Sequence, residues 1–388
     1  MQPNDSEAND RSGTSCFDIG FNFCYHSNVV HGNGNFSYSK WFLWKLAFFL
    51  AFLPVTLTIL IFLVTTDQVS FYTNRLFSSD DANKVATSTT TIILTGDLFL
   101  GRDVEQKIAA LGLSYPLQHV SDEFSLADYV VVNFESSVPN IHQATPSGSF
   151  TFSVPIKNLD LLKQNNITHA SLANNHSDDY GVNGYKETRA NLEKHTAVFG
   201  SAYTVDEEIS VAYLDTVTGK VALIGVNLAG APFLDKDAKT LFSVVNQKSE
   251  LQLVYVHWGE EYEPVHSDKQ RDIAASLVNM GADIIVGHHP HVIQDVDYIN
   301  GVPVFYSLGN FIFDQYFSTD VQIGLILRLT LESDKGRIEL LPTSSIGTKA
   351  QSHILEEDEK QKSLQLLSSK SHPSLKQNIL HGVLPIAF

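Results

Sequence analysis

The sequence predicts an α/β fold in which polar residues follow the ends of successive strands. The three clearest strands are apolar runs at 251–256, 284–286 and 302–308. A helical pattern at 268–280 joins the first two runs and stops at Gly281. Strand–helix–strand units of this kind bind ligands beyond the carboxyl ends of their strands. We therefore expect a functional site at those ends.

The same alternation continues on both sides of this unit. Upstream, strands are predicted at 92–94, 129–132, 170–172 and 221–226. Helices are predicted to begin near Asp103 and to cover 159–164 and 185–194. Downstream, 323–331 and 338–341 flank a polar turn, which is typical of a β-hairpin. Residues 346–388 are polar and loosely helical, and they form a predicted C-terminal extension.

An uncharged segment at 46–64 is long enough to span the hydrocarbon core of a membrane as a helix. Lys40 and Lys45, with two tryptophans between them, lie on its N-terminal side and favour a cytoplasmic N-terminus. A cleaved signal peptide is the alternative. It is disfavoured because the preceding tail is long and no small-residue cleavage site follows Val64 closely.

The N-terminal part of the chain is therefore expected to hold the protein in the cell membrane. We expect a disordered cytoplasmic tail at 1–39, a single-pass transmembrane anchor at 40–65 and a stalk at 66–90. The C-terminal domain would then be extracytoplasmic. The two cysteines, Cys16 and Cys24, both precede the anchor and are a weak metal or disulfide signal.

The net charge of −17 argues against nucleic acid as a partner, because such binding needs clustered Lys and Arg. The residues at the predicted strand ends instead suit metal binding. They are Asp97, Glu135, Asn175, His176, His257, His289 and His291. Each alone is ordinary, since Asp caps helices and His packs in cores. Together they offer oxygen and nitrogen ligands without thiolates, a set that suits one or two Mn, Fe or Zn ions.

We expect these residues to converge on one end of a sheet. His257, His289 and His291 should share a metal, because parallel strands joined by a crossover helix bring their carboxyl ends to the same edge. Two ions bridged by a carboxylate would clamp a phosphoryl or acyl oxygen and activate a water.

The strand-end residues belong to longer motifs that follow one another over residues 91–316. These are Gly96-Asp97 with Gly101-Arg102, Asn133-Phe134-Glu135, Ala173-Asn174-Asn175-His176 with Asp179-Tyr180-Gly181, His257-Trp258-Gly259 with Glu261-Tyr262, Gly281-Ala282-Asp283, Gly287-His288-His289-Pro290-His291 and Tyr306-Ser307-Leu308-Gly309-Asn310-Phe311. In this order they resemble the CapA family of poly-gamma-glutamate capsule synthesis proteins, which is similar in fold to calcineurin-like metallophosphoesterases. The resemblance implies a four-layer α/β/β/α metallophosphatase-like sandwich over 91–345, after the predicted transmembrane helix.

The resemblance also implies metal-binding roles. Asp97 would bind one metal, Glu135 occupies the place of the bridging carboxylate, and Asn175 would bind the second metal. His257, His289 and His291 would complete the coordination of both metals. His288 would point to the opposite face of its strand from His289, and we expect a structural role for it.

Roles in catalysis and substrate binding follow in the same way. His176 would be the general acid, oriented by Asp179. Arg102 would bind a substrate anion or neutralise Glu135 or Asp97, and Asn310 would hydrogen-bond a ligand. Metallophosphoesterases usually carry Asp-x-His at the first strand end, where this chain has Phe99. One metal shell would therefore be a ligand short.

The expected function is a metal-dependent hydrolase or transferase that acts on a cell-surface polymer, by resemblance poly-gamma-glutamate or a related capsule. A non-catalytic accessory subunit, which holds or exports the polymer beside membrane synthase subunits, is the first alternative. A phosphoesterase of the cell envelope is the second. Metal content separates the accessory subunit from the two enzymes, and a chromogenic phosphodiester separates the enzymes from each other.

Overall fold

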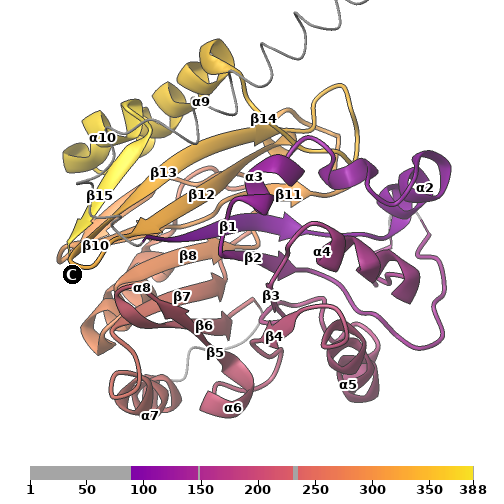
Figure 1. Cartoon of the computed structure of the whole chain (residues 1–388), viewed down its shortest axis with the longest axis horizontal. Helices are drawn as coiled ribbons and strands as arrows, with labels where there is room; N and C mark the ends of the chain where they lie inside the picture. Colours follow the sequence, from indigo (N-terminus) through magenta and orange to yellow (C-terminus); the bar gives the residue numbers. More distant parts are fainter. Residues whose placement is uncertain (1–88, 147–148, 230–234, 388) are drawn as a thin grey trace, which may run out of the picture. The chain divides into compact units, whose positions relative to one another are not determined.

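The computed structural model describes residues 89–146, 149–229 and 235–387 of the chain. The described elements form two β-sheets with helices around them, which confirms the expected α/β class (Figure 1). The predicted tail and transmembrane anchor lie outside the described residues, as do residues 66–88 of the predicted stalk. Within the described ranges, no helix has the length and apolar character needed to cross a bilayer. Residues Val85–Phe388 form one compact unit.

The larger sheet has nine strands among the described residues, in the order β14-β13-β12-β1-β2-β3-β4, with β11 beside β1 and β15 beside β13. These strands are β1 (Thr90–Leu98), β2 (Tyr129–Phe134), β3 (His169–Ser171), β4 (Ala197–Phe199), β11 (Asn310–Ile312), β12 (Ile323–Leu331), β13 (Lys335–Ser344), β14 (His353–Ile354) and β15 (Val383–Ala387). Strands β1 to β4 are parallel, so their carboxyl ends lie on one edge. The predicted hairpin is present as β12 and β13.

The smaller sheet, counted over the same ranges, has six strands in the order β5-β6-β7-β8-β10-β9. They are β5 (Val211–Thr216), β6 (Gly219–Asn227), β7 (Leu251–His257), β8 (Ile284–His288), β9 (Val296–Ile299) and β10 (Val302–Phe305). Strands β6, β7, β8 and β10 are parallel. The ends of β7 and β8 therefore lie side by side, as the sequence predicts.

Helix α8 (Asp268–Met280) joins β7 to β8 and has the predicted bounds. Ser267 and Gln270 form a capping box at its start, which satisfies backbone N–H groups that the first turn leaves unpaired. Gly281 ends the helix in the left-handed conformation, with φ of +113°. Local sequence signals thus determine both ends of this helix.

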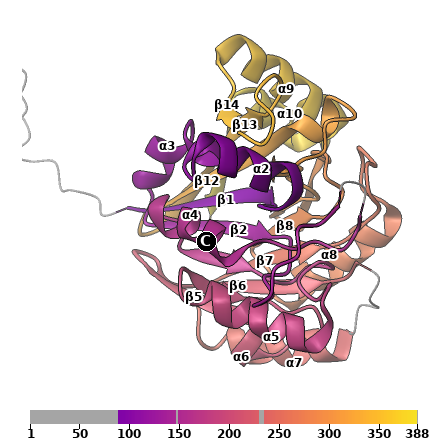
Figure 2. The same ribbon diagram turned by 90° about the vertical axis from the view of Figure 1, so that its right-hand side faces the viewer.

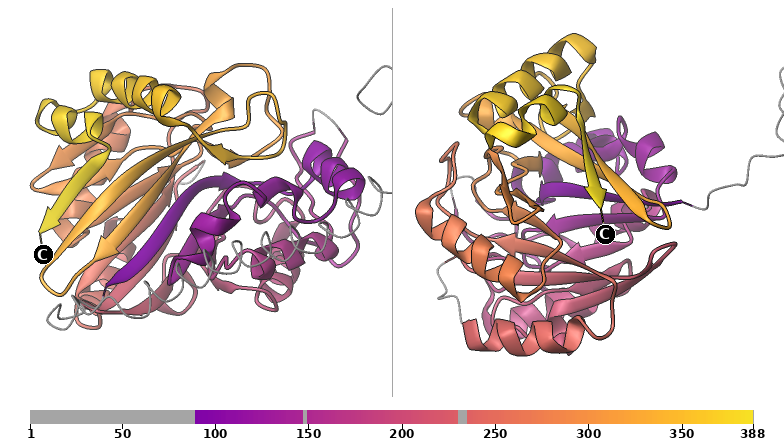
Figure 3. Two further views of the ribbon diagram at one scale, coloured as in Figure 1. Left: turned by 45° about the horizontal axis from the view of Figure 1, so that its top comes forward. Right: turned by 90° about the vertical axis from the view of Figure 1, so that its left-hand side faces the viewer.

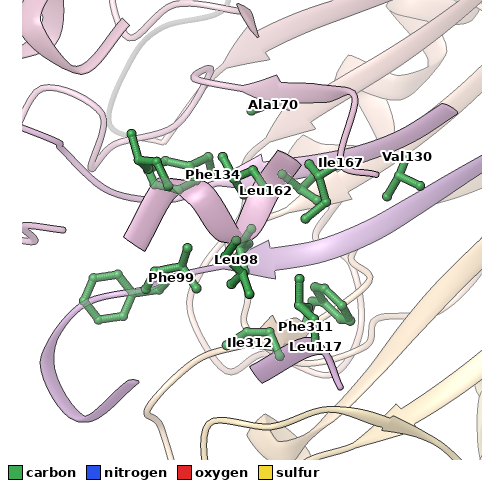
Figure 4. Packing of buried hydrophobic residues seen from close by; sticks show 14 of the residues in the cluster. Leu98, Phe99, Leu117, Val130, Phe134, Leu162, Ile167, Ala170, Phe311 and Ile312 are labelled. Carbon is green, nitrogen blue, oxygen red and sulfur yellow. The ribbon is translucent and has the colours of Figure 1, made fainter. Parts of the chain in front are cut away.

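Three hydrophobic cores separate four layers of secondary structure. The first core packs helices α2 (Arg102–Leu111), α3 (Ser121–Ser125), α4 (Asp160–Gln164) and α5 (Gly181–Leu192) on the larger sheet. Leu98, Val130 and Ile167 belong to it (Figure 4). The second core lies between the two sheets. The third packs α7 (Asp235–Val245) and α8 on the smaller sheet, which completes a helix–sheet–sheet–helix arrangement.

The remaining helices are short, apart from α9. Among the described residues they are α6 (Glu207–Ser210), α9 (Glu357–Lys370), α10 (Lys376–Leu380) and four 3-10 turns at Tyr115–Leu117, Ile156–Leu159, Asp320–Gln322 and Pro373–Leu375. Helices α9 and α10 lie at the opposite end of the domain from α5, α6 and α7 (Figure 2).

The C-terminal segment differs from its sequence prediction, because it contributes strands as well as helices. Strand β15 pairs with β13 antiparallel, and Leu364 and Leu367 of α9 join the core between the sheets. Figure 3 shows α9, α10 and β15 (yellow) lying against strands of the larger sheet (orange). The strand is short, and its pairing depends on β13, so the local sequence pattern did not reveal it.

Candidate metal centre

The predicted ligands meet at the carboxyl ends of strands from both sheets, not at the end of one sheet as the sequence suggested. Asp97 lies near the end of β1, Glu135 directly after β2, and Asn175 in the turn after β3. His257 is the last residue of β7, and His289 directly follows β8. Face-to-face packing of the sheets brings these two edges together.

Two groups of side chains have the geometry to hold a metal ion. One consists of Asp97, Glu135 and His291, and the other of Glu135, His257 and His289. Within each group the potential ligand atoms lie within 4.8 Å of one another. Asn175 adjoins the second group, since its Oδ1 is 2.7 Å from His257 Nε2. Glu135 belongs to both groups, the position expected of a bridging carboxylate.

Carboxamide side chains hold these ligands in place. Asn133 Nδ2 donates to Asp97 Oδ1 at 2.8 Å, and Asn133 Oδ1 accepts from Asn174 Nδ2 at 3.1 Å. Asn310 Oδ1 lies 3.0 Å from His291 Nδ1. Asp97 Oδ2 lies 3.3 Å from the same Nδ1, and a hydrogen bond from Nδ1 to either oxygen leaves His291 Nε2 facing Glu135 Oε1, at 3.6 Å. Asn310, predicted to contact substrate, thus contacts a metal-ligand candidate.

The electrostatics of the centre show how well a cation would fit. Glu135 is fully buried, and its Oε1 has no hydrogen-bond partner in the part of the chain that the structure describes. Burial and the neighbouring charge of Asp97 raise the pKa of Glu135 well above its usual value. A buried carboxylate oxygen without a partner is costly, and a metal ion would remove that cost. The residues present therefore fit a metal.

The pKa values of the imidazoles shift in opposite directions in the two ligand groups that share Glu135. Burial lowers the pKa of His257 well below its usual value, and burial lowers that of His289 to about 4. Both rings are then neutral near pH 7, which is the form that binds metals. Burial also disfavours the charged form of His291, but Glu135 and Asp97 outweigh it and raise its pKa to about 9.

Asp97 is held in its charged form by two histidines. Burial opposes its ionisation, but hydrogen bonds from His288 and His291 outweigh burial and lower the pKa of Asp97 well below its usual value. His288 Nδ1 lies 3.1 Å from Asp97 Oδ1. The sequence placed His288 on the opposite face from its neighbour. The chain leaves strand geometry at His289, whose φ is +98°, so strand alternation does not extend past His288.

His176 and Asp179, the predicted catalytic pair, are in contact. His176 Nδ1 is 2.9 Å from Asp179 Oδ2, and His176 Nε2 is 4.0 Å from Glu135 Oε1. The ring of His176 stacks on Phe152, with 3.9 Å between centroids. Asp179 and Phe152 therefore orient the imidazole so that Nε2 faces the shared carboxylate.

Arg102 does not point to Glu135 or Asp97, which the sequence offered as alternative partners. Its guanidinium pairs with Asp314 and donates to the backbone oxygen of Ser149 at 3.0 Å. It also lies over the ring of Phe152, at 4.5 Å from the centroid. Contact with a substrate anion stays a prediction, and in this structure it would compete with Asp314.

Comparison with known proteins identifies the family. A family model described as bacterial capsule synthesis protein PGA_cap matches residues 91–315. The chain belongs to this PGA_cap family. The matched region contains every candidate site residue from Asp97 to Asn310, and it ends before the strands and helices of the C-terminal segment.

Two relatives have descriptive names. The PGA biosynthesis protein CapA of Bacillus subtilis (strain 168) is 32% identical over 265 residues, covering 64% of this chain and 69% of the relative. The capsule biosynthesis protein CapA of Bacillus anthracis is 30% identical over 275 residues, covering 65% and 66%. Among solved structures, a hypothetical protein from Thermus thermophilus has a TM-score of 0.41 at 15% identity, covering 69% of this chain and 100% of that chain.

Some residues around the candidate centre of this PGA_cap protein were not identified from sequence patterns. Phe99 is fully buried, 4.6 Å from the ring of Phe152 and 5.1 Å from that of Phe313. Phe99 therefore belongs to an aromatic cluster and supplies no metal ligand. The position of Asn133 at the centre could have been predicted, because it lies two residues before Glu135 and alternate residues of an extended chain share a side. The position of Asp314 could not, because its partner is 212 residues away.

Several residues at or near the candidate centre have a strained backbone. Arg102, Tyr262, His289 and His291 have positive φ values of 49°, 67°, 98° and 59°. Non-glycine residues rarely adopt this conformation, and it persists where surrounding structure enforces it, often at functional sites. The loops that carry these four residues are thus held in specific, unfavourable conformations.

Proposed function

We propose that this protein is a metal-dependent hydrolase or transferase that acts on a cell-surface polymer during synthesis of a bacterial capsule. The observation that carries the proposal is the pair of ligand groups sharing Glu135, whose buried Oε1 has no hydrogen-bond partner among the described residues. Membership of the PGA_cap family and the names of the two Bacillus relatives support poly-gamma-glutamate, or a related polymer, as the substrate.

The chain's own residues define how ions would be held. One ion would bind Asp97, Glu135 and His291. The other would bind Glu135, Asn175 and the group's two histidines, His257 and His289. Such ions, of the Mn, Fe or Zn type, lower the pKa of a bound water and polarise the bond under attack.

His176 has the geometry to deliver a proton to the leaving group. Asp179 accepts the hydrogen bond from Nδ1, which leaves Nε2 as the atom that exchanges a proton with substrate. Phe152 covers one face of the imidazole and limits the access of water from that side. Asn133 holds Asp97 in place by donating a hydrogen bond to its Oδ1.

The proposal includes a cell-membrane location with the domain extracytoplasmic and in contact with membrane synthase subunits. It rests on the uncharged segment at 46–64 and the lysines before it. Protease added to intact cells should remove the C-terminal domain and leave the N-terminal tail. A domain that is protected in intact protoplasts, and cleaved only after lysis, would contradict this topology.

Elemental analysis of residues 85–388, purified without chelator, tests the catalytic proposal. This fragment contains the three hydrophobic cores and forms a compact unit. We expect about two equivalents of transition metal, from the two ligand groups. Protein that stays metal-free after reconstitution would contradict the proposed enzymatic function and favour an accessory subunit. With metal bound, rapid cleavage of a chromogenic phosphodiester would favour a phosphoesterase of the cell envelope.

A further inference from the structure

A groove of about 700 Å³ lies between helix α9, the strands beneath it and the loop that follows β7. Its apolar lining includes Tyr262, Ile293, Ile323, Ile346, Leu366 and Leu367. Helix α9 lies beyond the region matched by the PGA_cap family, so the groove combines family elements with the C-terminal segment.

The groove exposes apolar side chains to solvent. Leu366 is 64% exposed, Ile346 45% and Tyr262 41%. Phe317, 66% exposed, packs edge-on against Tyr262 with 5.1 Å between ring centroids and extends the apolar surface. Clustered exposed apolar side chains of this kind mark binding sites more often than isolated ones do.

Tyr262 connects the groove to the metal centre. Its ring centroid lies 6.1 Å from that of His291. Its Oη accepts a hydrogen bond from Gln315 at 3.2 Å, and Gln315 accepts one from Asn310 at 2.9 Å. Asn310 in turn contacts His291 Nδ1. Side-chain contacts therefore run from a metal-ligand candidate to a residue that lines the groove, which places the groove next to the metal centre.

The charges along the groove do not suit a run of carboxylates. Lys370 donates hydrogen bonds to the backbone oxygens of Pro264 and Ile293, so its ammonium group already has partners within the fold. The other basic lining residues in the described part of the chain are Lys362 and His353, and Asp320 and Glu359 line the same groove. An anionic polymer would therefore meet carboxylates as well as cations, together with a large apolar surface.

We propose that this groove binds the aliphatic chain of a lipid-linked substrate whose anionic head group lies at the metal centre. The inference rests on the proposed function, because the metals would hold the head group. The groove's volume is typical of small-molecule sites, which span about 300–1,000 Å³. Its position next to the metal centre, with Tyr262 in contact with both, favours a substrate over the surface of a partner protein.

Fluorescence titration of residues 85–388 with a dansyl-labelled C11 fatty acid tests the groove directly. The protein should bind the probe and enhance its fluorescence. Dodecyl phosphate should displace it, and a ten-residue gamma-glutamate oligomer should not. Loading with Mn²⁺ should strengthen dodecyl phosphate binding at least tenfold and leave dodecanol unaffected, since only the phosphate can reach the metal. Displacement by the oligomer as effective as that by dodecyl phosphate would overturn the inference.

Two substitutions test whether the ligand binds in the groove. Leu366→Asp and Ile346→Asp should each weaken probe binding about tenfold or more, because each puts a carboxylate beside the aliphatic chain. Leu126→Asp is the matched control, since Leu126 is 80% exposed and does not line the groove. All three variants should retain cooperative unfolding and the parent's Mn²⁺ affinity. Equal probe binding by the parent and both groove variants would overturn the inference.

The two proposals fail in different ways. Protein that binds Mn²⁺ but not the probe would contradict the proposed lipid binding by the groove and would leave the proposed enzymatic function unaffected. Protein that binds the probe through Leu366 but holds no metal contradicts the proposed enzyme, and with it the position assigned to the head group. Metal binding, measured by isothermal titration, and probe binding, measured by fluorescence, thus separate the two.

Discussion

The two sheets contribute different chemistry to the centre. The ends of the larger sheet's strands supply oxygen ligands, Asp97, Glu135 and Asn175. The ends of the smaller sheet's strands supply the imidazoles of His257, His289 and His291. Each candidate group contains residues from both sheets. The centre is therefore a product of sheet packing, and neither set of strand ends forms one of these groups without the other.

The two contributions also differ electrostatically. The carboxylate that the larger sheet places at the middle of the centre has a raised pKa, because burial disfavours its charge. Two of the smaller sheet's imidazoles have lowered pKa values, so they remain neutral ligands. The larger sheet thus supplies one carboxylate with a lowered pKa, Asp97, and one with a raised pKa, Glu135, whose charge a metal ion would stabilise. The smaller sheet supplies nitrogen ligands at little electrostatic cost.

Removal of the shared oxygen ligand should have the largest effect. Glu135→Gln removes a ligand from both groups, so we expect loss of most bound metal, with an affinity decrease of 100-fold or more by isothermal titration. Glu105→Gln is a matched control, because Glu105 pairs with His142 outside the centre. If Glu135→Gln kept both metals, the carboxylate would not be shared.

Removal of one imidazole should affect one group and spare the other. We expect His257→Ala or His289→Ala to lose about one equivalent of metal, and His291→Ala to lose the other, by elemental analysis. The melting temperature of each variant should respond less to chelator than the parent's. His195→Ala, whose ring pairs with Asp160, should retain all its metal. A His289→Ala protein with the parent's metal content would refute that assignment.

Loss of a supporting carboxamide should weaken metal binding without abolishing it. Asn133→Ala removes the donor that holds Asp97, and losses of about 10- to 100-fold in affinity are usual for such supporting residues. Asn191→Ala removes another buried carboxamide, bonded to the Val138 backbone away from the centre, and should lower stability alone. Equal metal affinities for these two variants would mean that Asn133 serves only packing.

A partly buried imidazole outside the centre offers the smallest and most selective test. Burial lowers the pKa of His169, in the larger sheet, to about 4. The unfolded chain takes up this proton near pH 6.5, so the stabilisation is complete above that pH and is lost as pH falls toward 4. Urea unfolding should show a loss of about 2 kcal/mol between pH 7 and 5 from this group.

His169→Gln removes the titrating ring and should flatten that part of the stability profile without changing metal content. His195→Gln serves as its control, since that ring pairs with the largely exposed Asp160. An unchanged pH profile for His169→Gln would show that the ring titrates alike in the folded and unfolded chain.

Local sequence signals determined the elements that carry the ligands. The capping box at Ser267, the glycine after Met280 and two apolar runs specify the β7–α8–β8 unit, because caps and periodicity act over a few residues. The types of ligand were also evident, since oxygen and nitrogen side chains follow each strand. Parallel pairing of β7 and β8 then placed their ends together, as predicted.

Only the tertiary structure decided how those strand ends are combined. It divides the strands between two sheets, gives Glu135 a place in both ligand groups and brings His288 to Asp97. It pairs Arg102 with Asp314 and builds a groove from α9. These contacts join residues far apart in the chain, and they depend on how apolar faces pack across the cores, which no local pattern of residues encodes.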